Sequence, residues 1–378
     1  MSQRNAVLAQ VAMDRKDWDS AAHHAEAALA DGYEPARPML AVIAYNRRDY
    51  ATAIRIIEGL PGAGGSEFGL LIRLHLVGGD ASRAWKLLLE CCRADLFVAP
   101  LFDLPRWSGE PLAGRRVVVW GSGNGDDILF ARFVAPLVAA GAIVTVNCRP
   151  ALVRLFRSLS GVADVLPLDE PARDAELQIH LAELPALLGI SEADVWHGPY
   201  LHAEPLRLAK RGFRIGLVWG TDGTHFEADL RSASLADMSP LAAVPGVRLF
   251  SLQFGSHAAQ AVPAPAGMLI KDLTVGCRDF AGTAAAIAGL NLTISIDTAT
   301  ANLAGAMGAP VWVPLPFVSD FRWSADGTRP RWYPSAKPYR QTVRGDWRSV
   351  FVAMANDLAE LTAGLRTGDR REDERVAW

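Results

Sequence analysis

The sequence of 378 residues predicts an α/β protein with two parallel sheets that follow an all-helical N-terminal region. Three observations predict this class. A helical motif recurs in the first hundred residues, which is typical of stacked helical hairpins. Strand-like and helix-like segments alternate from residue 116 onward, as they do in parallel sheets. Polar or glycine-rich turns follow several of the strand-like segments, where α/β sheets bind ligands.

The repeats are aligned by an aspartate and by an alanine four places later. The aspartates are 32 and 31 residues apart, at Asp17, Asp49 and Asp80, and the alanines are Ala21, Ala53 and Ala84. A small residue after a turn lets paired helices approach closely. Because one hairpin cannot bury its apolar face alone, the units should stack. Two roles remain open for this array, a surface for a protein or peptide partner and a structural cap or dimer surface.

The two sheets follow, each with its own strands and helices. For the first we expect strands near 116–121, 143–148, 163–167 and 176–182, helices near 126–140 and 150–159, and a crossover at 191–212. For the second we expect strands near 213–219, 247–253, 268–272, 292–296 and 311–315, helices near 234–243, 279–289 and 298–308, and a last helix over 347–365. The predicted domains are 1–100, 101–212 and 213–365, with a charged, mobile tail at 366–378.

Composition excludes several classes of partner. Half of the chain is hydrophobic and the net charge is −3, so neither nucleic acid nor an anionic membrane is expected as the main partner. The four cysteines show no metal-ligand spacing, which predicts no metal site and a reducing compartment. The N-terminus lacks the apolar stretch of a signal peptide, and no long apolar run predicts a membrane span. We therefore expect a cytoplasmic protein.

The turn "GSGNGDD" after the first strand invites two interpretations. A dinucleotide site needs a third glycine, but Asp126 occupies that place, and no acidic residue ends the next strand to hold a ribose; this disfavours a nicotinamide oxidoreductase. Alternatively, Asp126 at the helix start is a general base, or simply a cap. The glycine loop, Gly123, Asn124 and Gly125, would let a substrate approach the backbone. Asp127 is expected to be a plain cap or a solvent-exposed residue.

A second turn, in "SIDTATANLAGAMG", predicts an anion site. Free backbone amides at the helix start, with the hydroxyls of Thr298 and Thr300 on either side of Ala299, suit a phosphate. Asp297 cannot face that phosphate comfortably, so it should cap the helix or bind sugar hydroxyls. A plain structural turn remains the alternative.

Other polar residues lie at or near strand ends of the second half. Arg231 suits a bidentate phosphate contact beside Ser232, with a surface salt bridge as the alternative. Trp219 and Gln253 each end a strand, and Trp219 is either a core residue or a ligand contact. His225 is interpreted as an exposed loop histidine or a second proton-transfer group.

Several of these segments together resemble bacterial tetratricopeptide-repeat glycosyltransferases. The resemblance rests on 104–137, "GPYLHAEP", "RIGLVWG", 231–255 and 294–335. The catalytic part is similar to lipopolysaccharide heptosyltransferases and, more remotely, to O-linked N-acetylglucosamine transferase. The resemblance implies the GT-B fold of two facing Rossmann-like domains, a nucleotide-sugar donor, no required metal and no further cofactor.

The resemblance also assigns residues. It implies Asp126 as the base that deprotonates the acceptor, and Arg231 with Ser232 beside the donor diphosphate. It implies Gln253 near the nucleotide base and ribose. Asp297 belongs by resemblance to the donor site, where we also expect Trp219, Thr298, Ala299, Thr300 and Asn302.

The chain departs from these relatives at four positions. Phe254 stands where lysine is frequent, Gly282 and Asn291 stand where aspartates are common, and Asn302 replaces a frequent histidine. Because a cation and a histidine are missing, either the donor differs or activity is reduced. A nucleoside monophosphate leaving group would carry less charge and need fewer cations.

The function expected from the sequence is therefore an inverting transfer of a sugar to an acceptor hydroxyl. The expected acceptor is a protein serine or threonine presented by the repeats, and the resemblance makes a flagellin or another surface protein a candidate. Two alternatives remain open, a catalytically inactive scaffold that binds a protein partner and a lipopolysaccharide-directed glycosyltransferase. The sugar, the nucleobase and the oligomeric state are not predicted.

Overall fold

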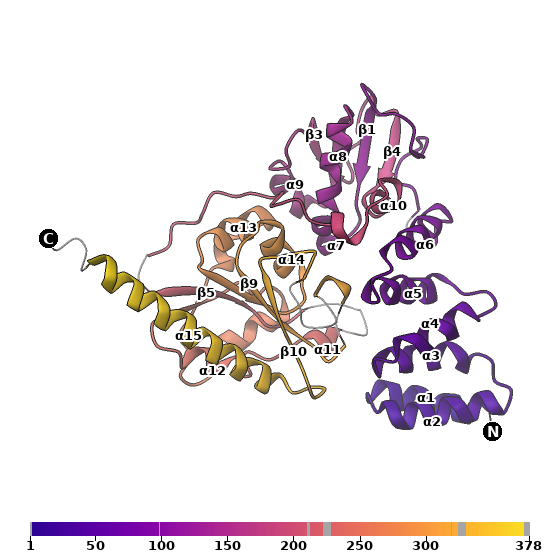
Figure 1. Cartoon of the computed structure of the whole chain (residues 1–378), viewed down its shortest axis with the longest axis horizontal. Helices are drawn as coiled ribbons and strands as arrows, with labels where there is room; N and C mark the ends of the chain where they lie inside the picture. The colour runs from indigo at the N-terminus through magenta and orange to yellow at the C-terminus, as the bar shows by residue number, and fades with distance from the viewer. Residues whose placement is uncertain are drawn as a thin grey trace. The chain divides into compact units, whose positions relative to one another are not determined.

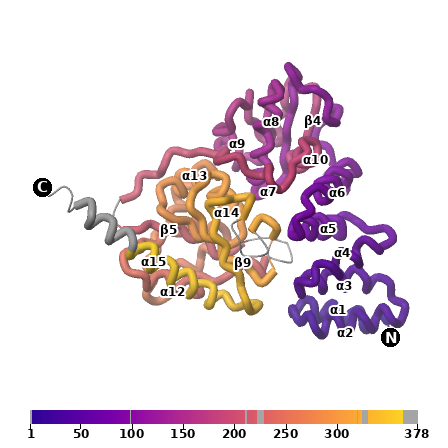
Figure 2. Tube along the Cα trace, in the orientation of Figure 1, coloured from indigo at the N-terminus to yellow at the C-terminus, as the bar shows by residue number. Residues whose placement is uncertain are grey.

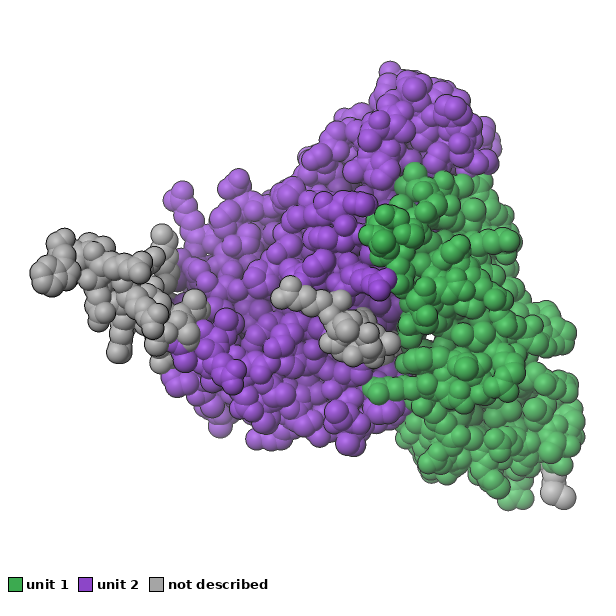
Figure 3. All heavy atoms as spheres, viewed as in Figure 1, with its two compact units in different colours: residues 1–101, 185–194 green, residues 102–184, 195–378 purple. Residues whose placement is uncertain are grey.

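The computed structural model describes residues 2–97, 99–209, 212–221, 228–318, 320–323 and 330–373, with side chains as far as residue 363. The chain forms two compact units (Figure 3). The first comprises Met1–Leu101 and Pro185–Asp194, and the second comprises Phe102–Leu184 and Val195–Trp378.

The first unit is built from helices that pack in consecutive pairs, which can be followed along the trace in Figure 2. They are α1 (Ser2–Asp14), α2 (Trp18–Ala30), α3 (Ala36–Asn46), α4 (Tyr50–Glu58), α5 (Gly65–Val77) and α6 (Ala81–Arg93). The strongest contacts join α1 to α2, α3 to α4 and α5 to α6. The N-terminal helical repeats predicted from the aspartate spacing are confirmed.

The same turn is used in all three repeats. The aligned aspartates are the N-caps of α2, α4 and α6, and each accepts a hydrogen bond of 3.1 Å from the backbone amide three residues later. The residue before each aspartate has a positive φ, at Lys16, Arg48 and Gly79. The aligned alanines are fully buried at Ala21, Ala53 and Ala84. The cap sets where the second helix begins, and the alanine lets it approach its partner.

In the second unit, a first parallel sheet has the strand order β3-β2-β1-β4 (Figure 1). Its strands are β1 (Arg116–Trp120), β2 (Ile143–Cys148), β3 (Asp164–Pro167) and β4 (Leu177–His180). Its helices are α7 (Asn124–Phe130), α8 (Val134–Ala139), α9 (Pro150–Phe156) and α10 (Leu184–Leu187). The strand order reverses at β1, so the turns after β1 and β4 border the crevice where such sheets bind ligands.

The second parallel sheet has the order β10-β9-β8-β5-β6-β7. Its strands are β5 (Phe213–Val218), β6 (Val247–Ser251), β7 (Ile270–Asp272), β8 (Leu292–Ser295), β9 (Val311–Leu315) and β10 (Ala336–Arg340). Its helices are α11 (Ala228–Arg231), α12 (Ser239–Ala242), α13 (Phe280–Ala288), α14 (Ala299–Ala306) and α15 (Trp347–Asp373). The order reverses between β5 and β8, which places the turns after both strands at one crevice. The predicted α/β class with two parallel, Rossmann-like sheets is confirmed.

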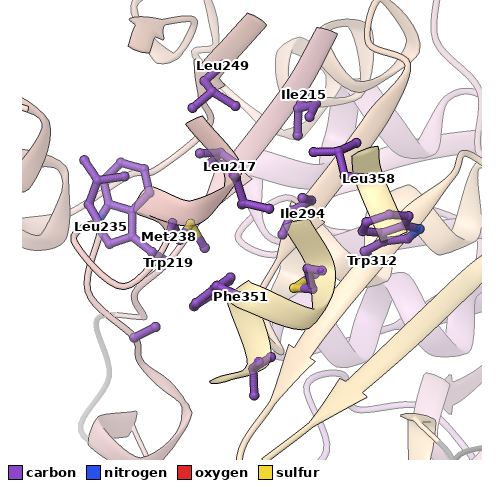
Figure 4. Packing of buried hydrophobic residues seen from close by; sticks show 14 of the residues in the cluster. Ile215, Leu217, Trp219, Leu235, Met238, Leu249, Ile294, Trp312, Phe351 and Leu358 are labelled. Atoms are coloured by element: carbon purple, nitrogen blue, oxygen red, sulfur yellow. The ribbon is translucent and has the colours of Figure 1, made fainter. Parts of the chain in front are cut away.

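A buried hydrophobic cluster joins α15 to this second sheet (Figure 4). Phe351 and Leu358 of α15 belong to the same cluster as Ile294 of β8 and Trp312 of β9. Burying a large apolar side chain contributes roughly 1.5–3 kcal/mol. The cluster therefore makes the sheet a rigid base for the turns that follow its strands.

The helix expected over 126–140 is interrupted. It consists of α7, a 3-10 turn at Ala131–Phe133, and α8. Pro136 explains the break, because proline has no N–H to donate and is tolerated only in the first turn of a helix. Accordingly, α8 restarts two residues before it.

Three further expectations about the second sheet are corrected. The helix expected over 234–243 is reduced to α12, because the Asp237 carboxylate accepts bonds from the amide and hydroxyl of Ser234 and holds a turn there. Strand β10 was not expected, since its sequence, AKPYR, is polar and contains proline; it pairs in parallel with β9 at an edge. The last helix does not end at Leu365, and α15 continues to Asp373.

No helix within the described residues is both long and apolar enough to cross a bilayer. All four cysteines are buried and unbridged. Within the same described ranges, no three histidine, cysteine or acidic side chains gather as a metal site would require.

Candidate functional site

The two carboxylates of the glycine turn differ in environment. Asp127 is 2% exposed, and its Oδ1 accepts a 3.1 Å hydrogen bond from the backbone amide of Gly123. A Cβ on Gly121 would lie only 2.2 Å from that Oδ1. Gly121 is therefore a glycine because the Asp127 carboxylate occupies the space beside its backbone. Asp127 was expected to be a plain cap or a solvent-exposed residue; it is buried and binds an amide at the start of the helix.

Burial raises the pKa of Asp127 from 3.8 to about 7. The folded chain thus binds this proton more tightly than the unfolded chain does. The stability that this group contributes is fully present below pH 4 and is lost as the pH rises to 7. Relative to Asp127→Asn, we expect the wild-type free energy of unfolding to fall by about 2 kcal/mol between pH 5 and pH 8. Urea unfolding of both proteins at each pH measures this difference, and parallel pH profiles would contradict it.

Asp126 is 65% exposed and forms an ion pair with Arg322. The Arg322 side chain is only 13% exposed, and its Nη1 also donates to Asp320 Oδ1 at 2.6 Å. Burial alone would lower the pKa of Arg322, but Asp320, Asp126 and Asp297 together raise it. Sequence reasoning missed Arg322, because 196 positions separate it from Asp126. Its place two residues after Asp320 was the only local signal.

A second ion pair, between Arg231 and Asp297, lies close to Asp320 and Arg322. Arg231 Nη1 lies 3.7 Å from Oδ2 of the buried Asp297. Burial and the nearby Asp320 raise the pKa of Asp297, while Arg231 and Arg322 oppose that shift. Asp297 was expected to cap α14 or to bind sugar hydroxyls, but the N-cap is Thr298, which makes no side-chain capping bond. The salt-bridge alternative for Arg231 is the arrangement found, with a buried partner in place of a surface one.

The start of α14 lines a cavity of about 440 Å³. Thr298, Ala299 and Thr300 contribute to it, and the Thr298 hydroxyl lies 2.9 Å from that of Ser295. The turn after β5 contributes Gly220 and Thr221, and the turn after β6 contributes Phe254. The remaining walls come from Cys277 and Asp279, just before α13, and from Ala151 of α9. The first amides of a helix have no intrahelical acceptor, so this cavity offers hydrogen-bond donors to an anion.

Three residues expected at the donor are engaged by the protein itself. Trp219 is fully buried in the core, so its indole does not reach the cavity. Gln253 borders the cavity, but its amide is bonded to the backbone of Trp219, Gly220 and Phe254 at 2.7–2.9 Å. The Ser232 hydroxyl donates to Ala228 O at 2.9 Å and accepts from the amide of Thr221 at 3.1 Å. Gln253 and Ser232 hold the turn that shapes the cavity.

The glycine loop packs against α14. A Cβ on Gly125 would meet Asn302 Nδ2 at 3.7 Å and Ala299 at 3.9 Å. Asn302 is buried and donates to Thr298 O at 3.1 Å, while its Oδ1 and that of Asn124 are buried with no hydrogen bond inside the described ranges. Gly125 therefore faces α14, where the sequence had suggested a substrate, and a Cβ at this position would make only ordinary van der Waals contacts.

One of the altered positions has a structural explanation. A side chain on Gly282 would begin 2.8 Å from the Cα of Cys277. Asn291 Oδ1 accepts from both the backbone amide and the Nε of Arg214 at 3.0 Å, bonds that an aspartate would accept as well, so the structure does not explain the asparagine. Phe254, in contrast, is exposed and borders the cavity. His225 lies outside the described residues.

His180, at the end of β4, is a residue that the sequence analysis missed. Its ring packs against Trp120 at 4.6 Å, and its Nε2 lies 3.5 Å from the hydroxyl of Ser122. Burial lowers the pKa of His180 to about 4, so the ring is neutral near pH 7. Its position as a polar residue at the end of a predicted strand was the signal that could have identified His180 as a candidate.

Comparison with known proteins gives distant likenesses. No family model matches this chain. Protein FlbA of Caulobacter vibrioides is 24% identical over 324 residues, which covers 75% of this chain and 53% of FlbA. The chain thus spans about half the length of this curated relative.

The solved structures found to be similar share few residues with this chain. A family 9 glycosyl transferase from Veillonella parvula is 14% identical and covers 62% of this chain and 88% of its own, with a TM-score of 0.45. The ADP-heptose lipopolysaccharide heptosyltransferase II of E. coli is 13% identical, with 66% and 99% covered and a TM-score of 0.45. The Thermobaculum terrenum O-GlcNAc transferase is 14% identical, with 98% and 92% covered and a TM-score of 0.33. All three are glycosyltransferases.

Proposed function

We propose that this chain is an inverting, metal-independent glycosyltransferase that moves a sugar from a nucleotide-sugar to an acceptor hydroxyl. One observation carries the proposal: the start of α14 lines a cavity and packs against the segment that bears Asp126. The contact runs through Gly125, the residue before Asp126, and Ala299, which lines the cavity. The proposed base and the proposed anion site therefore belong to neighbouring segments.

The chemistry assigned to this site is a single displacement. The Asp126 carboxylate accepts the proton of the acceptor hydroxyl as its oxygen attacks the anomeric carbon. The bond from that carbon to the phosphate oxygen breaks, and the amides at Thr298–Thr300 stabilise the departing charge. Attack opposite to the leaving group inverts the anomeric centre.

The acceptor we propose is a serine or threonine hydroxyl of a protein, such as a flagellin or another surface protein. The three capped hairpins of the first unit support this choice, because stacked helical hairpins form extended surfaces that bind peptides. Functional boundaries near 1–100, 101–212 and 213–365 belong to the same proposal.

A matched pair of variants tests the anion site. Thr298→Asp and Thr298→Asn have the same shape and both cap a helix well, so they differ only in charge. We expect Thr298→Asp to bind the nucleotide product about tenfold more weakly than Thr298→Asn, because its carboxylate repels phosphate. Titration calorimetry measures the difference, and equal affinities would show that the anion binds elsewhere.

Turnover is tested by incubating the full chain with a panel of sugar nucleotides and measuring the nucleotide released. Release from at least one donor, with the sugar found on a protein acceptor by mass spectrometry, is the expected result. The alternative of a non-catalytic scaffold is favoured by the full engagement of Gln253 and Ser232 with the protein backbone. Absence of release from every donor, with partner binding intact, would establish that alternative.

A further inference from the structure

Arg322 connects the turn that carries Asp126 to the second sheet. Its Nη2 donates to Asp126, in the first turn of α7, and its Nη1 donates to Asp320, after β9. The guanidinium lies 4.7 Å from the ring of Phe321, and the side chain is largely buried. Two edges of one planar group thus hold two carboxylates that come from different sheets.

Because the Asp126 side chain is exposed, its orientation depends on the bond from Arg322. Its carboxylate is mostly solvated, and the bond from Arg322 is the one hydrogen bond that its side chain makes to the described part of the chain. Without Arg322 the carboxylate would rotate among its staggered conformers in water. Arg322, in contrast, is held by burial and by Asp320.

We propose that Arg322 is a positioning residue that holds the Asp126 carboxylate at the start of α14. This inference rests on the proposed function, in which Asp126 is the base. A guanidinium has donors on two edges in a fixed plane and can bridge two carboxylates, whereas an ammonium is a compact point charge. The orientation of Asp126, in addition to its charge, depends on arginine at this position.

Arg322→Lys is the informative variant, because it keeps the positive charge and removes the planar bridge. We expect kcat for transfer to fall about 100-fold, as a small misplacement of a reacting group can cause. The KM for the donor should change less than threefold. The matched control is Arg154→Lys, since Arg154 forms another arginine–aspartate pair that links the two sheets, with Asp279 at 2.6–2.8 Å. Transfer by Arg154→Lys should stay within threefold.

A double-mutant cycle separates positioning from a general structural effect. If Arg322 acts through Asp126, then Arg322→Lys should lower kcat no further in an Asp126→Asn background. If the fold-loss in kcat of the double variant equals the product of the two single losses, the inference is overturned. A large loss in Arg322→Lys when Asp126→Asn alone is fully active would overturn it as well.

Hydrogen exchange provides a readout that does not need turnover. In Arg322→Lys, amides of 124–130 should exchange at least fivefold faster than in wild type, while Arg154→Lys leaves them unchanged. If no donor releases nucleotide but this exchange increases, the proposed function fails and the positioning contact stands. Unchanged exchange at 124–130 overturns the inference itself.

Discussion

Replacing Asp126 by asparagine should lower the rate of sugar transfer by about 10²–10⁴-fold, the range that a positioned general base contributes. Asparagine keeps the shape of the side chain and cannot accept the acceptor proton at neutral pH. Because Asp126 is largely solvated, the free energy of unfolding should change by less than about 1 kcal/mol. Steady-state kinetics with the best donor of the panel measures the loss.

The neighbouring carboxylate provides the control for that experiment. Asp127→Asn removes a carboxyl group one residue away, but burial already raises the pKa of Asp127 to about 7. At pH 6 the wild-type group is mostly neutral and resembles asparagine in charge and shape. Transfer at this pH should therefore stay within threefold in Asp127→Asn. Equal losses in the two variants would mean that the turn, and not the Asp126 carboxylate, is what activity requires.

Gly121→Ala should destabilise the fold by about 3 kcal/mol, the upper part of the range for overpacking a buried site. The new Cβ would lie 2.2 Å from Asp127 Oδ1 and 2.3 Å from its Cγ. This short, buried carboxylate has no room to withdraw and would lose its bond from the Gly123 amide. Since the backbone of Gly121 is not among the positive-φ positions, the loss is steric in origin. Urea unfolding measures it.

The steric explanation predicts a rescue. In an Asp127→Ala background the carboxylate is gone, and adding Gly121→Ala should cost less than about 1 kcal/mol. Gly123→Ala serves as the control, because a Cβ there meets Asp126 only at 3.7 Å. An equal loss from Gly121→Ala in both backgrounds would assign the effect to the backbone.

Much of the framework could be predicted from the sequence because its signals are local. The aspartates that align the repeats begin helices α2, α4 and α6 because each binds an amide three residues away. All nine predicted strands overlap observed strands by more than half of their length, since apolar runs bounded by polar turns suit buried parallel strands. The overlap is smallest near 176–182, where the strand is Leu177–His180. The edge strand β10 had no such signal, because its polar residues and Pro338 do not resemble a buried strand.

The candidate site was predictable in position but not in detail. Residues after β5, β6 and β8 line one cavity, because the carboxyl ends of parallel strands meet at one edge of a sheet. Asp126, Arg231 and Asp297 are not among the residues that line it. Which polar atoms remain available there depends on neighbours that are distant in the chain. Gln253 and Ser232 were predicted at the donor site, yet both are bonded to the turns that they support.

The sequence by itself thus determined the helical repeats, the two parallel sheets and the turns that follow their strands, since hydrophobic period and capping act over a few residues. Only the tertiary structure decided that Asp127 turns inward against Gly121 while Asp126 meets Arg322. The two aspartates are adjacent and chemically identical. What distinguishes them is packing and charge from segments far along the chain, which no local pattern encodes.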